Sequence, residues 1–264
     1  MEEEIDICHN KQKKLRILCF HGYYNNIDVM KHQFGYYEKV FETWAEFVYI
    51  NGFYENYDVF DYSLYKMFKD KKFYSWAIND ETTGKPKLFI DSLKYVVDYM
   101  NETGPYDGVL GFSQGTFLVR TLLKLDEFKT QFTKLIHPLS FGIIVSGPLR
   151  LSLNLFNDYP QDRYKFLTPF KQPVLYMYGE KDIYLKKIEF GVIEEGDYSV
   201  IKHSAGHNVP KLTGDQMEIF INFMEKVYYN KFGEKLQRAS PIDENFKKNF
   251  MSSQKDISKL SAKM

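Results

Sequence analysis

The chain has 264 residues, and its 35 Lys and Arg are balanced by 35 Asp and Glu, so the formal net charge is zero at pH 7. This balance excludes the strongly basic surface that is typical of nucleic-acid-binding proteins. No apolar run is long enough to span a bilayer, and the length suits a single domain with one sizeable core.

The N-terminal segment and the cysteines indicate a compartment. Residues 1–6 are acidic and have no apolar centre, so they do not resemble a signal peptide. Cys8 lies in a polar segment and Cys19 in an apolar one, so no disulfide between them is expected, and the free thiols suit a reducing compartment. We therefore expect a cytoplasmic protein with free thiols and no integral membrane segment.

Short apolar segments alternate with helical patterns along the chain. The expected strands, in chain order, are 15–20, 47–50, 106–110, 141–145, 173–178 and 199–202. Apolar residues at helical spacing indicate helices within 93–100, 116–125 and 217–228. Strands that alternate with helices predict an α/β fold, in which helices cover both faces of a mostly parallel sheet.

The segment Gly111-Phe-Ser-Gln-Gly115 stands between an expected strand and an expected helix. A Gly-x-Ser-x-Gly pattern alone is weak, because glycine and serine are common, but a preceding strand and a following helix are the context of a nucleophile elbow. The tight turn strains the serine backbone and leaves little room for side chains two residues away on either side. Ser113 is therefore the predicted nucleophile.

A serine nucleophile needs a base and an acid that orients the base. Asp182 and Glu180 lie in the loop after the strand 173–178, and His203 and His207 follow the strand 199–202. In a parallel sheet these loops meet at the edge that gathers the active site. The prediction is Asp182 as the acid and His207 as the base, with Glu180 and His203 as their rivals.

The oxyanion formed by attack on a carbonyl needs two backbone donors. The amide of Gln114 immediately follows the nucleophile. The loop from His21 to Asn25 follows the first strand, and Gly22 allows its backbone to approach the substrate. The Tyr23 amide is therefore the predicted second donor.

Three regions are expected along the chain. Residues 1–13 form a polar leader, 14–231 the catalytic domain, and 232–264 a polar tail with a small excess of positive charge. The tail is expected to be solvated, with binding to a partner or to a membrane surface as the alternative. Within the domain, 53–87 is an aromatic-rich insertion without a clear period; it is expected to form part of the substrate pocket, and the predicted substrate-binding residues are Tyr24, Phe73, Tyr74 and Trp76. For the last three, covering the sheet edge is the alternative.

Several of these segments resemble the family of small serine hydrolases called FSH. The matching pieces are 17–23, Trp76, 106–115, 178–182 and 203–210, which together span roughly residues 15 to 228. The resemblance implies an α/β-hydrolase fold, esterase or thioesterase activity without a metal, and Ser113, Asp182 and His207 as the catalytic triad.

The expected function is hydrolysis of a carboxylic ester through an acyl-enzyme on Ser113, with no cofactor. The substrate is expected to be a small-molecule acyl ester with a medium or long chain. An acyl thioesterase with the same triad is one alternative. The other is a catalytically silent scaffold that binds an acyl ligand or a protein, although such a scaffold has no need to keep all three triad residues.

Overall fold

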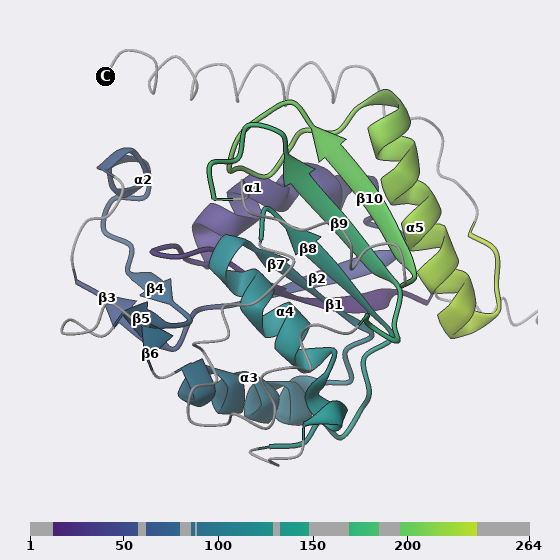
Figure 1. Cartoon of the computed structure of the whole chain (residues 1–264), viewed down its shortest axis with the longest axis horizontal. Coiled ribbons are helices and arrows are strands. Elements are labelled where there is room, and N and C mark those ends of the chain that lie inside the picture. Colours follow the sequence, from purple (N-terminus) through teal and green to yellow (C-terminus); the bar gives the residue numbers. More distant parts are fainter. Residues whose placement is uncertain are drawn as a thin grey trace, which may run out of the picture.

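A computed structural model describes residues 13–57, 62–79, 86–87, 89–128, 133–147, 169–184 and 196–236. Its centre is one six-stranded sheet (Figure 1). The strands are β1 (Leu15–Phe20), β2 (Ala45–Ile50), β7 (Gly108–Phe112), β8 (Phe141–Val145), β9 (Val174–Gly179) and β10 (Tyr198–His203). They lie in the order β10-β9-β8-β7-β1-β2, and every neighbouring pair is parallel. The predicted parallel sheet is confirmed.

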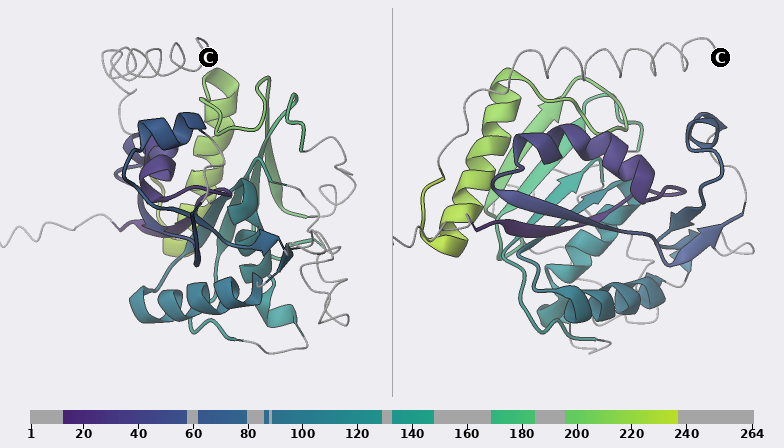
Figure 2. Two further views of the ribbon diagram at one scale, coloured as in Figure 1. Left: turned by 90° about the vertical axis from the view of Figure 1, so that its left-hand side faces the viewer. Right: turned by 180° about the vertical axis from the view of Figure 1, so that it is seen from behind.

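Helices cover both faces of this sheet (Figure 2). The helices α1 (Ile27–Val40) and α5 (Gly214–Phe232) share one apolar cluster with β1, and Tyr37 of α1 and Phe41, the residue after it, contact Phe220 of α5. The helices α3 (Phe89–Thr103) and α4 (Thr116–Leu122) belong to a second cluster on the opposite face. Both clusters include residues of the apolar stripes that the sequence shows at helical spacing, together with side chains of the strands.

The central strands are buried on both faces, which explains their nearly continuous apolar sequences. In β1, Leu18 and Phe20 belong to one cluster, whereas Ile17 and Cys19 belong to the other. Successive side chains of a strand point to opposite faces, so a single strand supplies both cores.

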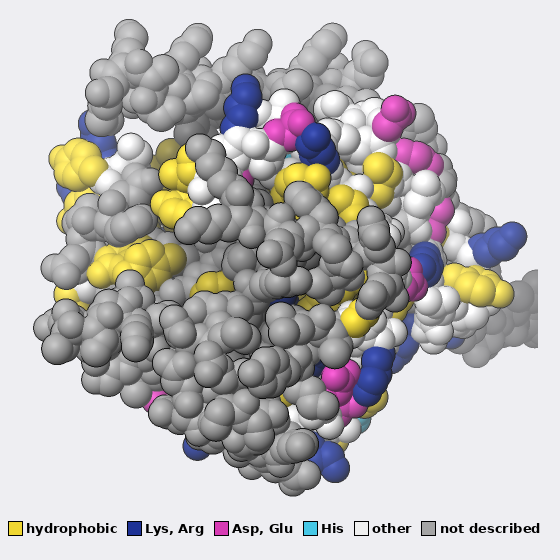
Figure 3. All heavy atoms as spheres, in the orientation of Figure 1, with side chains coloured by type: hydrophobic (Ala, Val, Ile, Leu, Met, Phe, Trp, Pro, Cys, Tyr) yellow, Lys and Arg dark blue, Asp and Glu magenta, His cyan; other side chains and the backbone are white. Residues whose placement is uncertain are grey.

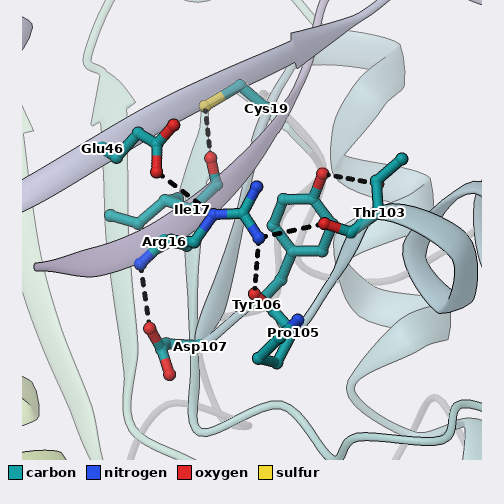
Figure 4. A network of polar contacts seen from close by, with 8 residues as sticks. All are labelled: Arg16, Ile17, Cys19, Glu46, Thr103, Pro105, Tyr106 and Asp107. Atoms are coloured by element: carbon teal, nitrogen blue, oxygen red, sulfur yellow. Dashed lines mark hydrogen bonds and ion pairs between the residues drawn. The ribbon is translucent and has the colours of Figure 1, made fainter.

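A polar network lies at the N-terminal ends of β1 and β7 (Figure 4). The backbone amide of Arg16 donates to Asp107, and the Arg16 guanidinium donates to Glu46 and to the carbonyls of Thr103 and Pro105. The strand β7 begins at Gly108, two residues later than the sequence predicts. The other strands agree with the prediction to within two residues.

The described parts of the insertion 53–87 lie at one end of the molecule, past the carboxyl ends of β1 and β2 (Figure 1). It contains the helix α2 (Tyr62–Met67) and four short strands, β3 (Tyr54–Asn56), β4 (Phe73–Ser75), β5 (Ile78–Asn79) and β6 (Pro86–Lys87). The pairs β3–β4 and β5–β6 are antiparallel. Strands of two or three residues are too short to produce a periodic pattern, which is why the sequence shows none.

The ends of the predicted domain are partly described. The helix α5 ends at Phe232, and Gly233 adopts the left-handed conformation that commonly terminates helices. Residues 1–12 of the predicted leader and 237–264 of the predicted tail lie outside the described residues. In the part of the chain that the structure describes, no helix has the length and apolarity needed to cross a membrane.

Candidate active site

Ser113 occupies a sharp turn between β7 and α4. Its φ of 51° lies in the left-handed region, which costs a non-glycine residue about 1–2 kcal/mol. A Cβ on Gly111 would lie 2.6 Å from the carbonyl carbon of Gly115, and a Cβ on Gly115 would lie 2.3 Å from the oxygen of Phe20. Both glycines of the motif are therefore required by close backbone packing, as the sequence predicts.

His207 and Asp182 lie beside Ser113 and form a hydrogen-bonded chain with it. The distance from Nε2 of His207 to Oγ of Ser113 is 2.8 Å, and that from Nδ1 of His207 to Oδ2 of Asp182 is 2.7 Å. An ionised carboxylate only accepts, so Nδ1 carries the proton and Nε2 is left to accept from the serine hydroxyl. The Asp182 side chain is buried, and its second oxygen accepts from the Tyr184 amide.

The two rival residues, Glu180 and His203, take no part in the hydrogen bonds that join Ser113, His207 and Asp182. Glu180 is exposed and forms an ion pair with Lys202 at 2.6 Å; this hydrogen bond lowers the pKa of the Glu180 carboxyl. His203 is buried at the end of β10, and burial lowers the pKa of its imidazole. Among the described residues, neither ring nitrogen of His203 has a hydrogen-bond partner.

The loop after β1 passes close to Ser113. A Cβ on Gly22 would lie 3.1 Å from the ring of Phe112 and 3.4 Å from Cβ of Ser113, so only glycine lets the loop run this close without displacing a neighbour. Tyr23 follows Gly22, and both Tyr23 and Gln114 line the cavity that contains Ser113. The assignment of their amides as oxyanion donors remains a prediction that is compatible with this placement.

The buried side chain of His21 holds the loop after β1 through two hydrogen bonds. Nε2 of His21 accepts a hydrogen bond from the Gly52 amide at 2.9 Å, so Nδ1 carries the proton and donates to the Gly22 carbonyl at 2.7 Å. This arrangement requires a neutral ring. Burial lowers the pKa of His21 to about 4, which keeps the ring neutral at physiological pH.

The insertion also fastens the loop. The indole nitrogen of Trp76 donates to the His21 carbonyl, and the Trp76 amide donates to the side-chain oxygen of Gln114. Gln114 in turn donates to the Ala77 carbonyl. The backbone groups of Tyr74 and Asn25 exchange two hydrogen bonds, which adds the loop to β4 as a short bridge.

The cavity has a volume of about 640 Å³ and is open to solvent. Its lining residues are Gly22, Tyr23, Tyr24, Asn25, Gln33, Leu64, Phe112, Ser113, Gln114, Phe117, Ser146, Tyr184, His207 and Asn208. Tyr24 is among them, as expected from the sequence, but Phe73, Tyr74 and Trp76 are not. Phe73 and Trp76 are buried beneath the loop, and Tyr74 pairs with it, so the expectation that these three form an acyl-binding wall is corrected.

Ser146 is a residue of the site that sequence reasoning missed. It lies after β8, is fully buried, and has a left-handed φ of 49°. Its hydroxyl donates at 2.9 Å to the carbonyl of Asn208, the residue after His207. The bond therefore ties the loop that carries His207 to the end of β8. The only signal in the sequence is the Ser146-Gly147-Pro148 turn after a strand, which is equally typical of an ordinary turn.

Comparison with known proteins agrees with this geometry. The family description "Serine hydrolase (FSH1)" matches residues 10–219. The chain belongs to this family.

Relatives in the FSH1 family carry esterase names. "Esterase GA18864" of Drosophila pseudoobscura pseudoobscura is 30% identical over 222 residues, which cover 81% of this chain and 72% of that protein. "Esterase C25G4.2" of Caenorhabditis elegans is 29% identical, over 80% of this chain and 93% of that protein. The FSH1 chain is thus an esterase-type hydrolase.

The fold has solved counterparts. The crystal structure of Zea mays acyl-protein thioesterase 2 aligns with 83% of this chain and 96% of that one, with a TM-score of 0.50 and 15% sequence identity. At this identity the likeness concerns the α/β-hydrolase fold alone. Within the described residues of the FSH1 chain, no cluster of three or more His, Cys, Asp or Glu side chains is placed to hold a metal ion.

The neutral, buried ring of His21 predicts a pH dependence of stability. The pKa of His21 is about 4 in the folded protein, against an ordinary value of 6.5 in the unfolded chain. Between pH 6.5 and 4 the unfolded chain binds a proton at this site and the folded protein does not, so the free energy of unfolding should fall as the pH drops. The loss attributable to His21 approaches about 3 kcal/mol near pH 4.

Urea denaturation at several pH values measures this effect. His21→Gln should reduce the slope of unfolding free energy against pH between 4 and 6.5, whatever its effect at neutral pH. His137 is exposed, so His137→Gln is the matched control and should keep the wild-type slope. An unchanged slope in the His21 variant would contradict the assignment.

Proposed function

We propose that this FSH1-family hydrolase cleaves a carboxylic ester through a covalent acyl-enzyme on Ser113. The observation that supports the proposal most directly is the 2.8 Å contact between Ser113 Oγ and His207 Nε2, continued by the 2.7 Å contact between His207 and Asp182. A base within hydrogen-bond reach of the serine and an acid that fixes the tautomer of the base are what nucleophilic catalysis requires.

In the first half of the reaction, Ser113 Oγ attacks the ester carbonyl carbon and its proton passes to His207 Nε2. The carbonyl oxygen becomes an oxyanion that faces the amides of Tyr23 and Gln114. The carbon–oxygen bond to the leaving group then breaks, and the departing alkoxide takes the proton from His207. This leaves the acyl group on Ser113 and releases an alcohol.

In the second half, water attacks the acyl carbon while His207 Nε2 accepts one of its protons. Collapse of the second oxyanion breaks the bond to Ser113, and the proton returns from His207 to Oγ. The products are the carboxylic acid and the free enzyme. Asp182 stabilises the protonated imidazole in both halves without being protonated itself.

Two ring contacts support His207 as the base. Its imidazole lies between Phe112 and Tyr184, at centroid distances of 5.5 Å and 4.7 Å. These neighbours limit rotation of the ring, so that the ring stays directed at Ser113. A thioester can use the same attack and the same oxyanion donors, so a thioesterase remains the alternative within this mechanism.

Replacement of the nucleophile tests the proposal. Ser113→Ala should lower kcat/KM on an activated acyl ester by about a thousandfold or more, because the acyl-enzyme can no longer form. The same variant should lose labelling by a fluorophosphonate probe. Ser204 is an exposed serine in the loop that carries His207, so Ser204→Ala is the control and should be labelled like the wild type. Near-normal hydrolysis by Ser113→Ala would move the nucleophile elsewhere, whereas a wild type that neither hydrolyses esters nor takes the probe would be a silent scaffold.

The two histidines can be separated in the same assay. His207→Ala should cost nearly as much as loss of Ser113, because triad members act as a unit. His203→Ala removes a buried ring whose nitrogens have no hydrogen-bond partner among the described residues, so the loss in kcat should be far smaller. A thermal melt of each variant separates loss of folding from loss of catalysis. An inactive His203 variant beside an active His207 variant would refute the assignment of the base.

The cavity predicts a preference for acyl chain length. Its apolar lining includes Leu64, Phe112 and Phe117, and each methylene buried against such walls contributes about 0.8 kcal/mol, or roughly a fourfold gain in kcat/KM. Specificity constants on p-nitrophenyl esters should therefore rise from two carbons to about eight. A steady decline from acetate upward would mean that the cavity accepts only a small acyl group.

A further inference from the structure

Large apolar side chains are exposed on both sides of the cavity that contains Ser113. Tyr62, Tyr65 and Met67 on α2 have exposed fractions of 66%, 42% and 42%, and Ile183 and Tyr184 after β9 have 65% and 66%. We call these five residues the mouth rim. They make up half of the ten large apolar side chains that are exposed among the described residues, so their grouping is not the scatter that ordinary surfaces show.

Two cavity-lining residues link the rim to the active site. Leu64 lies on α2 between Tyr62 and Tyr65, and Tyr184 belongs to the rim itself; both line the cavity with Ser113. The two halves of the rim are therefore brought to one opening by the fold, although more than 100 residues separate them in the sequence. In the space-filling view, hydrophobic side chains gather at the left edge, where α2 lies in the ribbon view (Figure 3).

The exposed residues of α2 do not contribute to the core. No residue of this helix is buried, and the rings of Tyr62 and Tyr65 stack on each other and are exposed. Its attachment is supplied by residues that follow it, because Phe68 contacts His32 of α1 and Lys71 pairs with Asp28. The fold thus holds α2 in place without using its aromatic side chains, which leaves them available to a binding partner.

The charges near the rim favour a neutral surface as that partner. Lys71 and Lys72 are neutralised by Asp28 and Glu55. Lys66, Lys69 and Lys181 are also exposed, but they are divided between the two sides of the rim, Asp70 follows Lys69, and the whole chain has a formal net charge of zero. Attraction to anionic lipid depends on clustered, uncompensated Lys and Arg. Tyrosine and aliphatic side chains, in contrast, partition into the boundary between lipid headgroups and acyl chains.

We propose that the mouth rim docks the protein on a zwitterionic lipid surface, so that an apolar ester passes from the lipid directly into the cavity. This inference rests on the proposed ester hydrolysis for its purpose, but the docking itself is independent of Ser113. Leu64 and Tyr184 place the two halves of the rim at the cavity that the substrate must enter, and acyl esters of medium or long chain concentrate in lipid. Shallow insertion of Tyr62, Tyr65 and Ile183 would place the opening against the phase that holds the ester.

Co-sedimentation of the full chain with phosphatidylcholine vesicles tests the docking. The wild type should bind, with little dependence on salt. Tyr62→Ser/Tyr65→Ser should lower the partition coefficient by about tenfold or more, because two partly inserted side chains are removed. Ile136 and Tyr229 are exposed at 66% and 53% away from the cavity, so Ile136→Ser/Tyr229→Ser is the matched control and should bind like the wild type.

Hydrolysis measurements separate docking from catalysis. The Tyr62→Ser/Tyr65→Ser variant should hydrolyse water-soluble p-nitrophenyl butyrate at the wild-type rate, yet lose about tenfold in rate on a long-chain ester carried in the vesicles. Ser113→Ala should bind vesicles like the wild type while hydrolysing neither ester. Activity retained by Ser113→Ala would overturn the proposed chemistry and leave the docking result standing.

Three outcomes would overturn the docking proposal. The first is a wild type that does not bind the vesicles, and the second is an equal loss of binding in the control variant. The third is a dimer in analytical ultracentrifugation that the rim variant dissociates, without vesicle binding by either protein; the rim would then be an interface between two copies of the chain.

Discussion

The backbone of Ser113 is the constraint on which the rest of the site depends. A left-handed φ of 51° turns the chain from β7 directly into α4 and holds the hydroxyl above the sheet edge. Such a conformation costs about 1–2 kcal/mol. It is maintained because Gly111 and Gly115 allow β7, the turn and the end of β1 to pack within a distance that any side chain would prevent.

The other parts of the site are held in place around this turn by contacts from distant segments. His21 fixes the loop that carries Tyr23 through the amide of Gly52, and Trp76 fixes the same loop from the insertion. Ser146 fixes the loop that carries His207. The contacts of His21 and Trp76 involve side chains that do not line the cavity, whereas Ser146 and Asn208 both line it, so only part of the scaffold that positions the site is separate from the surface that meets the substrate.

The insertion combines two roles on its two sides. Its inner segment, around Trp76, joins the loop after β1 to the side chain of Gln114 and is buried. Its outer segment, α2, contributes Leu64 to the cavity and exposes its aromatic side chains beside the opening. The same segment is therefore joined to the loop expected to bind the oxyanion, through the bridge between Tyr74 of β4 and Asn25.

Local patterns in the sequence predict the parallel sheet, the helices on its two faces and the turn at Ser113: apolar runs, helical spacing, and a glycine-serine turn between a strand and a helix. Asp182 and His207 were predicted from the order of the loops with Glu180 and His203 as rivals, and the folded chain places the predicted pair beside Ser113. The roles of Trp76, His21 and Ser146 were decided only by the tertiary structure. An aromatic residue in an irregular segment is compatible with a cavity wall or a buried support, and the choice depends on which backbone groups lie within hydrogen-bond distance. Those groups come from segments far apart in the chain, and no local pattern records that they meet.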